Sequence, residues 1–196
     1  MQISIQGYSR EFTQVQMTLN RHGIVNVFAE LQNKTLAEAL LGGRYAKMSD
    51  DVRRRYPDSL DERIGGFLFG LKTSNDTFYK HFLNKYGDSV FCDFSIERTA
   101  LTRKKGIYCF VVAGEMKYVG RSHDPFEKRF NQGYGHIWPK NCYLDGQSTN
   151  CRVNSLIAEH FGVVSLLVYP IEDDSIINPL EESLNESREP AWNIRR

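Results

Sequence analysis

Two tyrosine-bearing triplets supply the best candidates for chemistry in this chain. Gly106-Ile107-Tyr108 opens a run of β-branched and aromatic residues that is typical of a strand. Tyr118-Val119-Gly120 lies in a second predicted strand, with Tyr118 ten residues after Tyr108. Turn residues separate the two runs, so the strands are expected to form a hairpin. The two phenol groups can then either pack against each other across the hairpin or serve one polar site.

The length of the turn decides whether the two phenols share a face of the hairpin. Side chains alternate across a strand, so a two-residue loop at Gly114-Glu115 would place Tyr108 and Tyr118 on opposite faces. A three-residue loop, Ala113-Gly114-Glu115, would place them on the same face. If both tyrosines serve one site, the longer loop is predicted.

Further polar residues follow in a fixed order. Arg129 lies on a predicted basic helix over residues 124–130, and Glu181 lies on a later one over residues 175–188. Residues 106–194 thereby resemble the GIY-YIG nuclease superfamily, most closely its restriction-endonuclease branch. In chain order, the residues that carry the resemblance are Tyr108, Tyr118, Arg129, Glu181, Pro190, Trp192 and Asn193.

The resemblance implies a fold and an activity. The fold would be α+β, with a small three-stranded, mostly antiparallel sheet flanked by helices. The activity would be metal-dependent hydrolysis of DNA, with Glu181 binding Mg²⁺ or Mn²⁺ and Arg129 binding the phosphate. Tyr108 would be the general base and Tyr118 would orient the water or the phosphate. Asn193 would hold the substrate backbone or the base of the Glu181 helix, or it would simply cap the C-terminal part of the fold.

Two of these roles carry physical conditions. An ordinary tyrosine has a pKa of about 10, so Tyr108 would need a nearby cation or a metal-bound water to act near neutral pH. Glu182 is about 100° round the helix from Glu181, so only one of the two carboxylates can face the site. The spacing to Asn193 favours Glu181.

The segment after the Arg129 helix contains two candidates for an additional base. Tyr134 and His136 both lie there, next to Gly133 and Gly135, which are expected to interrupt the helix. We favour Tyr134 for direct chemistry and His136 for a supporting hydrogen bond. The choice between them stays open at the level of sequence.

Substrate contacts are expected from two places. Arg121 directly follows the second triplet, where it is either a phosphate contact or a surface residue. A polar insertion over residues 140–152 carries side chains of the kinds that contact phosphates and base edges, although such a loop is equally often only solvated. Its candidate residues are Lys140, Asn141, Gln147, Thr149, Asn150 and Arg152.

The 196 residues have a formal net charge of +1, unevenly distributed. Residues 1–105 carry 16 Lys and Arg against 12 Asp and Glu, whereas residues 106–196 carry 9 against 12. Because phosphate contacts supply most non-specific affinity, the N-terminal half is the expected source of basic contacts. We therefore predict a helical N-terminal region over residues 1–95, for DNA binding or dimerisation, and a nuclease domain over residues 96–196.

The N-terminal region reads as mostly helical. The predicted helices cover Glu11–Leu19, Ile24–Leu41 with a break near Asn33, a segment starting at Ser49, Asp58–Leu71 and Thr77–Tyr86. In the C-terminal half, a helix is predicted over Asn150–Phe161 and a buried strand over Val163–Tyr169.

The chain lacks an apolar run of membrane-spanning length and a signal peptide, so the cytoplasm is the expected location. Its four cysteines lack zinc-site spacing and are expected to be free thiols, with Cys109 packed in the hairpin.

Three functions remain in competition. The first is a sequence-specific, type II restriction-like endonuclease acting on double-stranded DNA, which would cut both strands as a homodimer or in two binding events. The second is a structure-specific or single-strand nuclease of repair or mobile-element type. The third is a nucleic-acid-binding module without catalysis. RNA is an alternative substrate.

Overall fold

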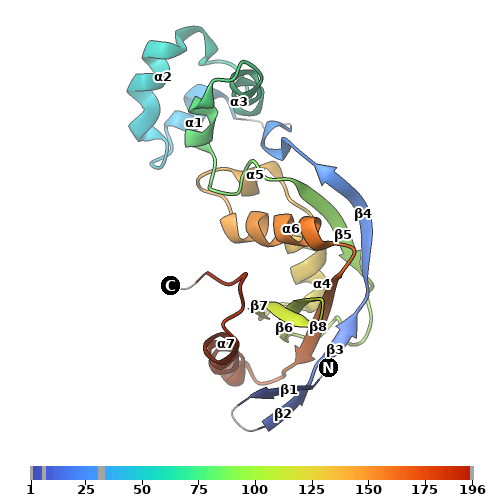
Figure 1. Ribbon diagram of the computed structural model, residues 1–196. Coiled ribbons are helices and arrows are strands. Elements are labelled where there is room, and N and C mark those ends of the chain that lie inside the picture. Colours follow the sequence, from blue (N-terminus) through green and yellow to red (C-terminus); the bar gives the residue numbers. More distant parts are fainter. Residues whose placement is uncertain (1, 6–7, 31–33, 195–196) are drawn as a thin grey trace. The chain divides into compact units, whose positions relative to one another are not determined.

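The computed structural model describes residues 2–5, 8–30 and 34–194 of a mixed α/β protein. The chain divides into two compact units (Figure 1). The sheet unit contains Met1–His22, Cys92–His136 and Leu156–Arg196, and the helical unit contains Gly23–Phe91 and Ile137–Ser155. Each unit is therefore built from separated stretches of sequence.

The main sheet of the sheet unit has four antiparallel strands among the described residues, in the order β3-β8-β6-β7. The three strands predicted from the C-terminal half are present as β6 (Gly106–Val112), β7 (Glu115–Ser122) and β8 (Val164–Pro170). The fourth strand is β3 (Thr13–Val15), which pairs with β8. The prediction of a three-stranded sheet was therefore one strand short. Without β3, the apolar strand β8 would lie at an open edge of the sheet.

The predicted helix over residues 11–19 was wrong, because this part of the chain forms strands. β1 (Gln2–Ile5) pairs with β2 (Tyr8–Glu11), and β4 (Met17–Ile24) follows β3 and pairs with β5 (Phe91–Ile96). Val15 and Met17 are buried between exposed Gln14, Gln16 and Thr18. That spacing is the two-residue period of a strand, which outweighs the weaker helical pattern of the same residues.

The hairpin brings Tyr108 and Tyr118 to the same face, but not by the predicted loop. The turn has only two residues, Ala113 and Gly114, both with positive φ, and Val112 pairs with Glu115. The register then shifts between Phe110 and Val111, which leaves one extra residue, Lys117, in β7. This β-bulge restores the odd count, so that Tyr108 pairs with Gly120 and Phe110 pairs with Tyr118.

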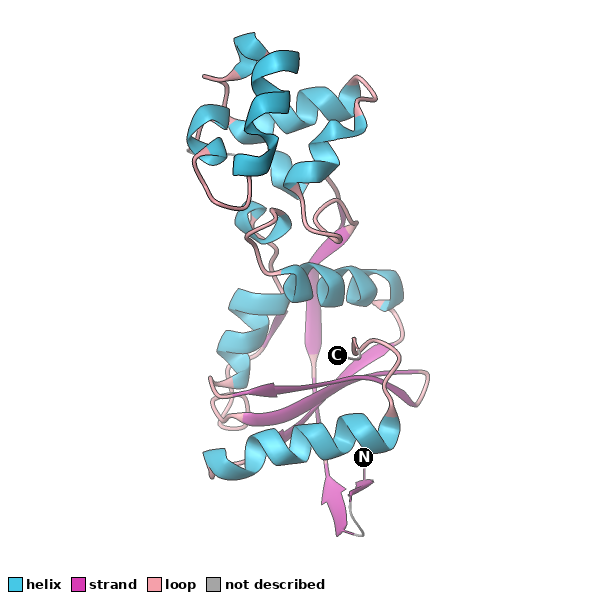
Figure 2. Ribbon diagram, turned by 90° about the vertical axis from the view of Figure 1, so that its left-hand side faces the viewer, coloured by secondary structure: helices cyan, strands magenta, loops and turns pink. Residues whose placement is uncertain are grey.

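Helices cover both faces of the hairpin. On one face, α7 (Asp174–Arg188) buries Ile177 and Leu184 against Ile107 and Val119, and Figure 2 shows this long helix running along the strands. On the other face, α4 (Phe126–Arg129) continues into the π-helical turn η5 (Phe130–Tyr134). The rings of Tyr108 and Phe130 are in edge-to-face contact there, with centroids 5.0 Å apart.

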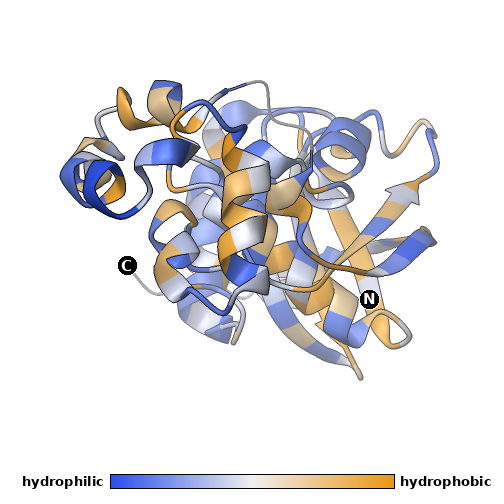
Figure 3. Cartoon of the chain, turned by 90° about the horizontal axis from the view of Figure 1, so that it is seen from above, coloured by the Kyte–Doolittle hydropathy of each residue, from blue (hydrophilic) through white to orange (hydrophobic). Residues whose placement is uncertain are grey.

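The helical unit is an array of short helices around its own aromatic core. Hydrophobic and hydrophilic residues alternate along the helices of the chain (Figure 3). The elements of the helical unit are η1 (Val27–Ala29), α1 (Leu36–Leu40), η2 (Ala46–Met48), α2 (Ser49–Arg55), η3 (Pro57–Ser59), α3 (Ile64–Thr73), η4 (Thr77–Phe82), α5 (Pro139–Cys142) and the first part of α6 (Ser148–His160).

Several sequence predictions hold in outline and change in detail. The helix predicted to start at Ser49 does so, and those over 150–161 and 175–188 agree with α6 and α7 within two residues. The segment 77–86 forms only a 3₁₀ helix, and the predicted break near Asn33 lies outside the described residues. All four cysteines are free, as predicted, and all four are buried, including Cys109 in the hairpin. No helix formed by residues 2–5, 8–30 or 34–194 is long and apolar enough to cross a membrane.

Candidate functional site

Three tyrosine hydroxyls meet in the sheet unit. The Tyr134 hydroxyl lies 3.0 Å from that of Tyr108 and 3.1 Å from that of Tyr118. Tyr134 and Tyr108 are almost completely buried, whereas Tyr118 keeps 9% of its surface exposed. We call these three residues the tyrosine cluster. Tyr118 is the member that a substrate can reach first.

Arg129 joins the cluster through two hydrogen bonds. Its Nε donates to the Tyr108 hydroxyl at 3.3 Å and its Nη2 donates to the Tyr134 hydroxyl at 2.7 Å, while the guanidinium lies 4.3 Å from the Tyr134 ring centroid. Tyr134 has a single proton to give to its two tyrosine neighbours. At least one of those neighbours must therefore donate to Tyr134, so the three hydroxyls form a directed chain with two hydrogen bonds, and the proton of one hydroxyl is not used within the chain.

The π-helical turn explains how Arg129 and Tyr134, five residues apart, face the same point. The Gly135 N–H donates to the Phe130 carbonyl at 2.6 Å, which closes the wider turn. Gly133 therefore lies inside the helical turn, whereas the helix ends at Tyr134 with Gly135 as its C-cap. A side chain at Gly135 would place its Cβ 2.2 Å from the Phe94 carbonyl oxygen of β5, so this close approach requires a glycine.

Gly120 is required for a similar reason. A Cβ at this position would lie 2.5 Å from the Tyr108 hydroxyl and from the ring carbon that bears it. The phenol of Tyr108 thus crosses the backbone of β7 in the space that a side chain would take. The absence of a side chain at Gly120, the glycine of the second triplet, therefore gives the Tyr108 phenol the space to reach Tyr134.

Burial sets the protonation of the cluster. Loss of water raises the pKa of Tyr108 well above its ordinary value, and the nearby Arg129 only partly opposes this. Burial raises the pKa of Tyr118 and Tyr134 in the same direction, and the charge of Glu181 adds to the shift of Tyr118. The cation that Tyr108 was predicted to need is present, yet the phenol stays neutral near neutral pH. The cluster therefore offers neutral hydrogen-bonding hydroxyls beside one permanent cation.

These raised pKa values predict a loss of stability at alkaline pH. In the unfolded chain the tyrosines titrate near pH 10, but in the folded chain the cluster titrates only above that. The stabilising contribution is therefore complete below about pH 10 and is lost as the pH rises through the folded-state pKa values. The urea midpoint is expected to fall between neutral pH and about pH 11. Tyr134→Phe should make this fall shallower, and an identical pH dependence of the two proteins would contradict the assignment.

Glu181 and Arg121 form an ion pair at the edge of this site. Arg121 Nη1 donates to Glu181 Oε2, joining the end of β7 to α7. The Glu181 side chain is 17% exposed and that of Arg121 is 39% exposed. Glu182, the next residue on the helix, is exposed to solvent, which agrees with the expectation that one carboxylate alone would face the site.

The donor set decides what kind of metal ion these residues could hold. Among the described residues there is no group of three or more His, Cys, Asp or Glu side chains that could hold a metal ion. Mg²⁺ commonly binds through one or two carboxylates together with water and phosphate oxygens. Glu181 therefore fits an ion shared with a phosphate-containing substrate, with Arg121 neutralising the carboxylate otherwise.

Asn193 is engaged with the backbone of β7. Its Oδ1 accepts from the Val119 N–H at 2.9 Å and its Nδ2 donates to the Val119 carbonyl at 2.7 Å. The Trp192 N–H donates to the carbonyl of the bulge residue Lys117 at 2.7 Å. The segment thus satisfies the open edge of β7, which gives Asn193 a role in holding the fold.

His136 takes part in a different set of contacts. Its Nδ1 lies 2.9 Å from Asp93 Oδ1 of β5, and Asp93 also pairs with Arg21 of β4. The structure therefore places Tyr134 in the cluster with Tyr108 and Tyr118, while His136 connects to the β4-β5 pair. Of the two candidates for an additional base, only Tyr134 hydrogen-bonds to the tyrosines.

The polar insertion belongs to the helical unit. Asn141 is buried and caps α5, accepting from the Trp138 N–H at 2.8 Å, and buried Asn150 donates to Gln147 at 2.6 Å. The Arg152 guanidinium lies 5.8 Å from the ring centroid of Tyr86. Exposed insertion residues that are available to a ligand include Lys140, Gln147 and Thr149.

Lys140, Asn141 and Gln147 also line a cavity of about 840 Å³ in the helical unit.

The sequence analysis missed two features of the site. The contact between Gly120 and the phenol of Tyr108 depends on the β-bulge, and a lone lysine at position 117 gives no signal of a bulge. The π-helical turn was also missed, although the glycines on both sides of Tyr134 were a visible sign of irregular backbone.

Comparison of the chain with protein-family models, with curated proteins and with solved structures finds no match. The interpretation of the site therefore depends on its own geometry and chemistry.

Proposed function

We propose that the chain is a metal-dependent DNA endonuclease of the GIY-YIG type, acting as a sequence-specific, type II restriction-like enzyme. The observation that carries the proposal is the cluster of the Tyr108, Tyr118 and Tyr134 hydroxyls, two of which accept hydrogen bonds from Arg129. A half-buried guanidinium held beside neutral phenols is suited to one oxyanion such as a phosphate. Glu181 supplies a carboxylate from α7, close enough to Tyr118 for its charge to raise the pKa of that phenol.

Each residue has a distinct task in this proposal. Arg129 binds a non-bridging phosphate oxygen and offsets the charge that grows there during hydrolysis. Tyr118 orients the phosphate or the attacking water. Tyr108 can accept the proton of that water only as it passes its own hydroxyl proton to Tyr134, which passes its proton to Tyr118 and so to solvent, and no phenol then carries a charge. Arg121 is a second phosphate contact once it leaves Glu181. A divalent ion bound by Glu181 would supply additional positive charge at the phosphate.

The function is tested by incubating the protein with supercoiled plasmid and long linear DNA in Mg²⁺, Mn²⁺ or EDTA. Discrete fragments that disappear in EDTA are expected. Protein carrying Glu181→Gln, purified in parallel, is the control for a contaminating nuclease. Cleavage restricted to single-stranded or branched DNA would instead support a repair-type nuclease, and binding without cleavage would support a non-catalytic module.

One site of this kind cuts one strand, so a double-strand break requires two copies or two binding events. Sedimentation of the protein with and without a duplex that contains the cleaved sequence distinguishes a homodimer from sequential cutting.

A further inference from the structure

A run of three basic residues, Arg103-Lys104-Lys105, precedes β6 and has no part in the site described above. Its backbone is fixed by neighbouring elements. The Phe126 N–H of α4 donates to the Lys104 carbonyl at 2.8 Å, and the Ile171 N–H donates to the Lys105 carbonyl at 2.9 Å. The Arg103 N–H donates to the Thr99 carbonyl at 3.2 Å. The three basic side chains are therefore carried on an ordered platform rather than on a free linker.

These side chains line a cavity of about 280 Å³ in the sheet unit. The cavity is bounded by cationic side chains, one histidine, one carboxylate and two apolar residues. The lining residues are Arg103, Lys104, Lys105, His123, Pro125, Ile171 and Glu172.

The charges of the lining are only partly neutralised. Lys105 pairs with Asp174 at 2.7 Å, and Lys104 lies 3.9 Å from the highly exposed Glu172. Within the described part of the chain, Arg103 has an exposed guanidinium with no ion pair or side-chain hydrogen bond. The cavity thus keeps an unpaired guanidinium and a weakly paired ammonium for an anion.

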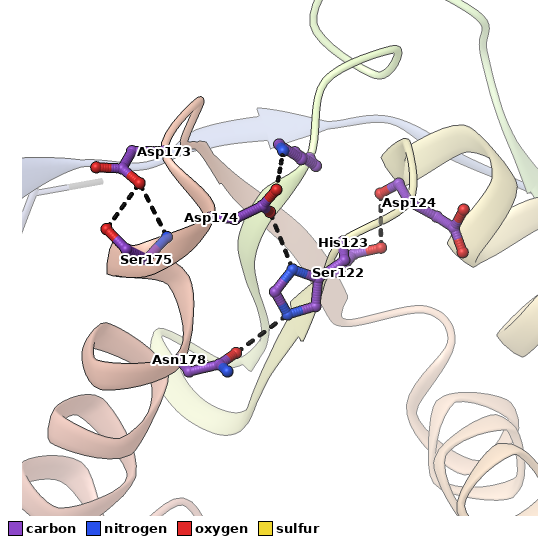
Figure 4. Close-up of polar contacts among 8 residues, drawn as sticks. Ser122, His123, Asp124, Asp173, Asp174, Ser175 and Asn178 are labelled. Atoms are coloured by element: carbon purple, nitrogen blue, oxygen red, sulfur yellow. Dashed lines mark hydrogen bonds and ion pairs between the residues drawn. The ribbon is translucent and has the colours of Figure 1, made fainter.

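His123 has a fixed orientation at the opposite wall. Its Nδ1 lies 3.0 Å from Asp174 Oδ1 and its Nε2 lies 3.0 Å from Asn178 Oδ1, as Figure 4 shows. Both partners are on α7, on the same side of the helix as Glu181, which is three residues beyond Asn178. The wall of the cavity and the Glu181 carboxylate are therefore positioned by one helix.

The strand register relates the cavity to the tyrosine cluster. Gly106, next to Lys105, pairs with Ser122, next to His123, whereas Tyr108 pairs with Gly120. The two pairs are two residues apart along the hairpin, or roughly 7 Å at about 3.3 Å per residue. Successive nucleotides of a DNA strand rise by about 3.4 Å, so phosphates two nucleotides apart on one strand match this separation along the axis.

We propose that the cavity formed by Arg103, Lys104 and His123 binds a backbone phosphate of the DNA strand that is cut, flanking the phosphate bound by Arg129. The inference rests on the proposed nuclease function and adds to it a second phosphate subsite. Free inorganic phosphate would satisfy the same chemistry, so the test separates the two sources.

The test measures duplex binding by fluorescence anisotropy at several salt concentrations, on the Glu181→Gln background so that the DNA stays intact. Loss of one phosphate contact should make the slope of log K against log salt shallower by about 0.9. We expect this change for Arg103→Ala and substantial recovery for Arg103→Lys. Lys117→Ala removes one positive charge near the turn, at the opposite end of the hairpin, and should leave the slope closer to that of the parent. Equal effects of Arg103→Ala and Lys117→Ala would overturn the proposal.

A second experiment identifies which phosphate binds in the cavity. Duplexes carry one neutral methylphosphonate at successive positions beside the mapped cleavage site. A methylphosphonate at one flanking position should weaken DNA binding by the parent protein but should not weaken DNA binding by the Arg103→Ala protein any further. Additivity at every position would overturn the subsite. Competition by inorganic phosphate beyond a chloride control of equal ionic strength, without any methylphosphonate effect, would assign the cavity to free phosphate.

Failure of the subsite and failure of the nuclease proposal give different results. If the wild-type protein cuts DNA but Arg103→Ala binds with unchanged affinity and slope, only the subsite is wrong. If the wild-type protein neither binds nor cuts DNA, both proposals are wrong.

Discussion

The Glu181→Gln protein is expected to fold normally and to cleave DNA more slowly by a factor of about 10² to 10³. Glutamine keeps the shape of the side chain but removes the negative charge that would hold a divalent ion. Because the Arg121–Glu181 ion pair is partly exposed, its loss should change the free energy of unfolding by no more than about 1 kcal/mol. The measurements are the initial rate of plasmid cleavage and the urea midpoint.

Glu182→Gln is the matched control for this change. It is the same substitution one residue further along α7, on a side chain that faces solvent. We expect it to leave the cleavage rate close to that of the wild type. A large loss of cleavage rate for Glu182→Gln, with no loss for Glu181→Gln, would show that Glu182 and not Glu181 is the functional carboxylate.

Binding of Mn²⁺, followed by electron paramagnetic resonance of the free ion, gives a second readout that needs no activity. Glu181→Gln should weaken it. Arg121→Ala should strengthen it, because the guanidinium that competes for the carboxylate is gone.

The residues that could take part in a reaction could be identified from the sequence, because their types and order are local features of the chain. Tyr108, Tyr118 and Arg129 lie within about twenty residues, on a hairpin and on the helix after it. The pattern of this one short segment therefore predicts that the three residues lie close together. The structure brings these three residues together with Tyr134. Their convergence depends only on strand parity and on one turn of helix.

The details that escaped prediction depend on backbone irregularities. The three-residue turn predicted from Tyr108 and Tyr118 serving one site was wrong: the turn has two residues, and the extra residue that brings both phenols to one face is Lys117, in the strand. A two-residue turn with positive φ at Ala113 and Gly114 matches the twist of a hairpin, so the bulge corrects the parity further along β7. Single-residue insertions of this kind leave no periodic signal in a sequence.

Long-range pairing accounts for the other differences. β3 joins a sheet whose remaining strands begin more than ninety residues later, and the polar insertion over residues 140–152 packs with the helical unit. Asn193, expected to hold the substrate backbone or the base of the Glu181 helix or to cap the C-terminal part of the fold, bonds the backbone of Val119. Each of these contacts is decided by which edge or face needs a partner in the folded chain, which local propensity does not encode.

The Gly120→Ala protein is expected to lose about 1 to 3 kcal/mol of stability and to lose cleavage with it. The new methyl group would lie 2.5 Å from the Tyr108 hydroxyl. The phenol ring has little room to retreat, because it is buried against Phe110, Phe130 and Tyr134. Relief of the clash must therefore displace the hydroxyl from Tyr134 and Arg129. Urea unfolding followed by far-ultraviolet circular dichroism measures the loss.

Gly70→Ala is the control, because the same methyl group in the exposed part of α3 would meet no atom within 4 Å. There the change should stabilise the protein by up to about 1 kcal/mol, since alanine favours a helix over glycine. Combining Gly120→Ala with Tyr108→Leu tests the cause, because the substitution at Gly120 should cost much less once the phenol is absent. If Gly120→Ala cost the same with and without the phenol, the glycine would be required by something other than Tyr108. In that case Gly120 would not be the residue that gives Tyr108 the space to reach Tyr134 and Arg129, and the proposed site would lose this part of its structural basis.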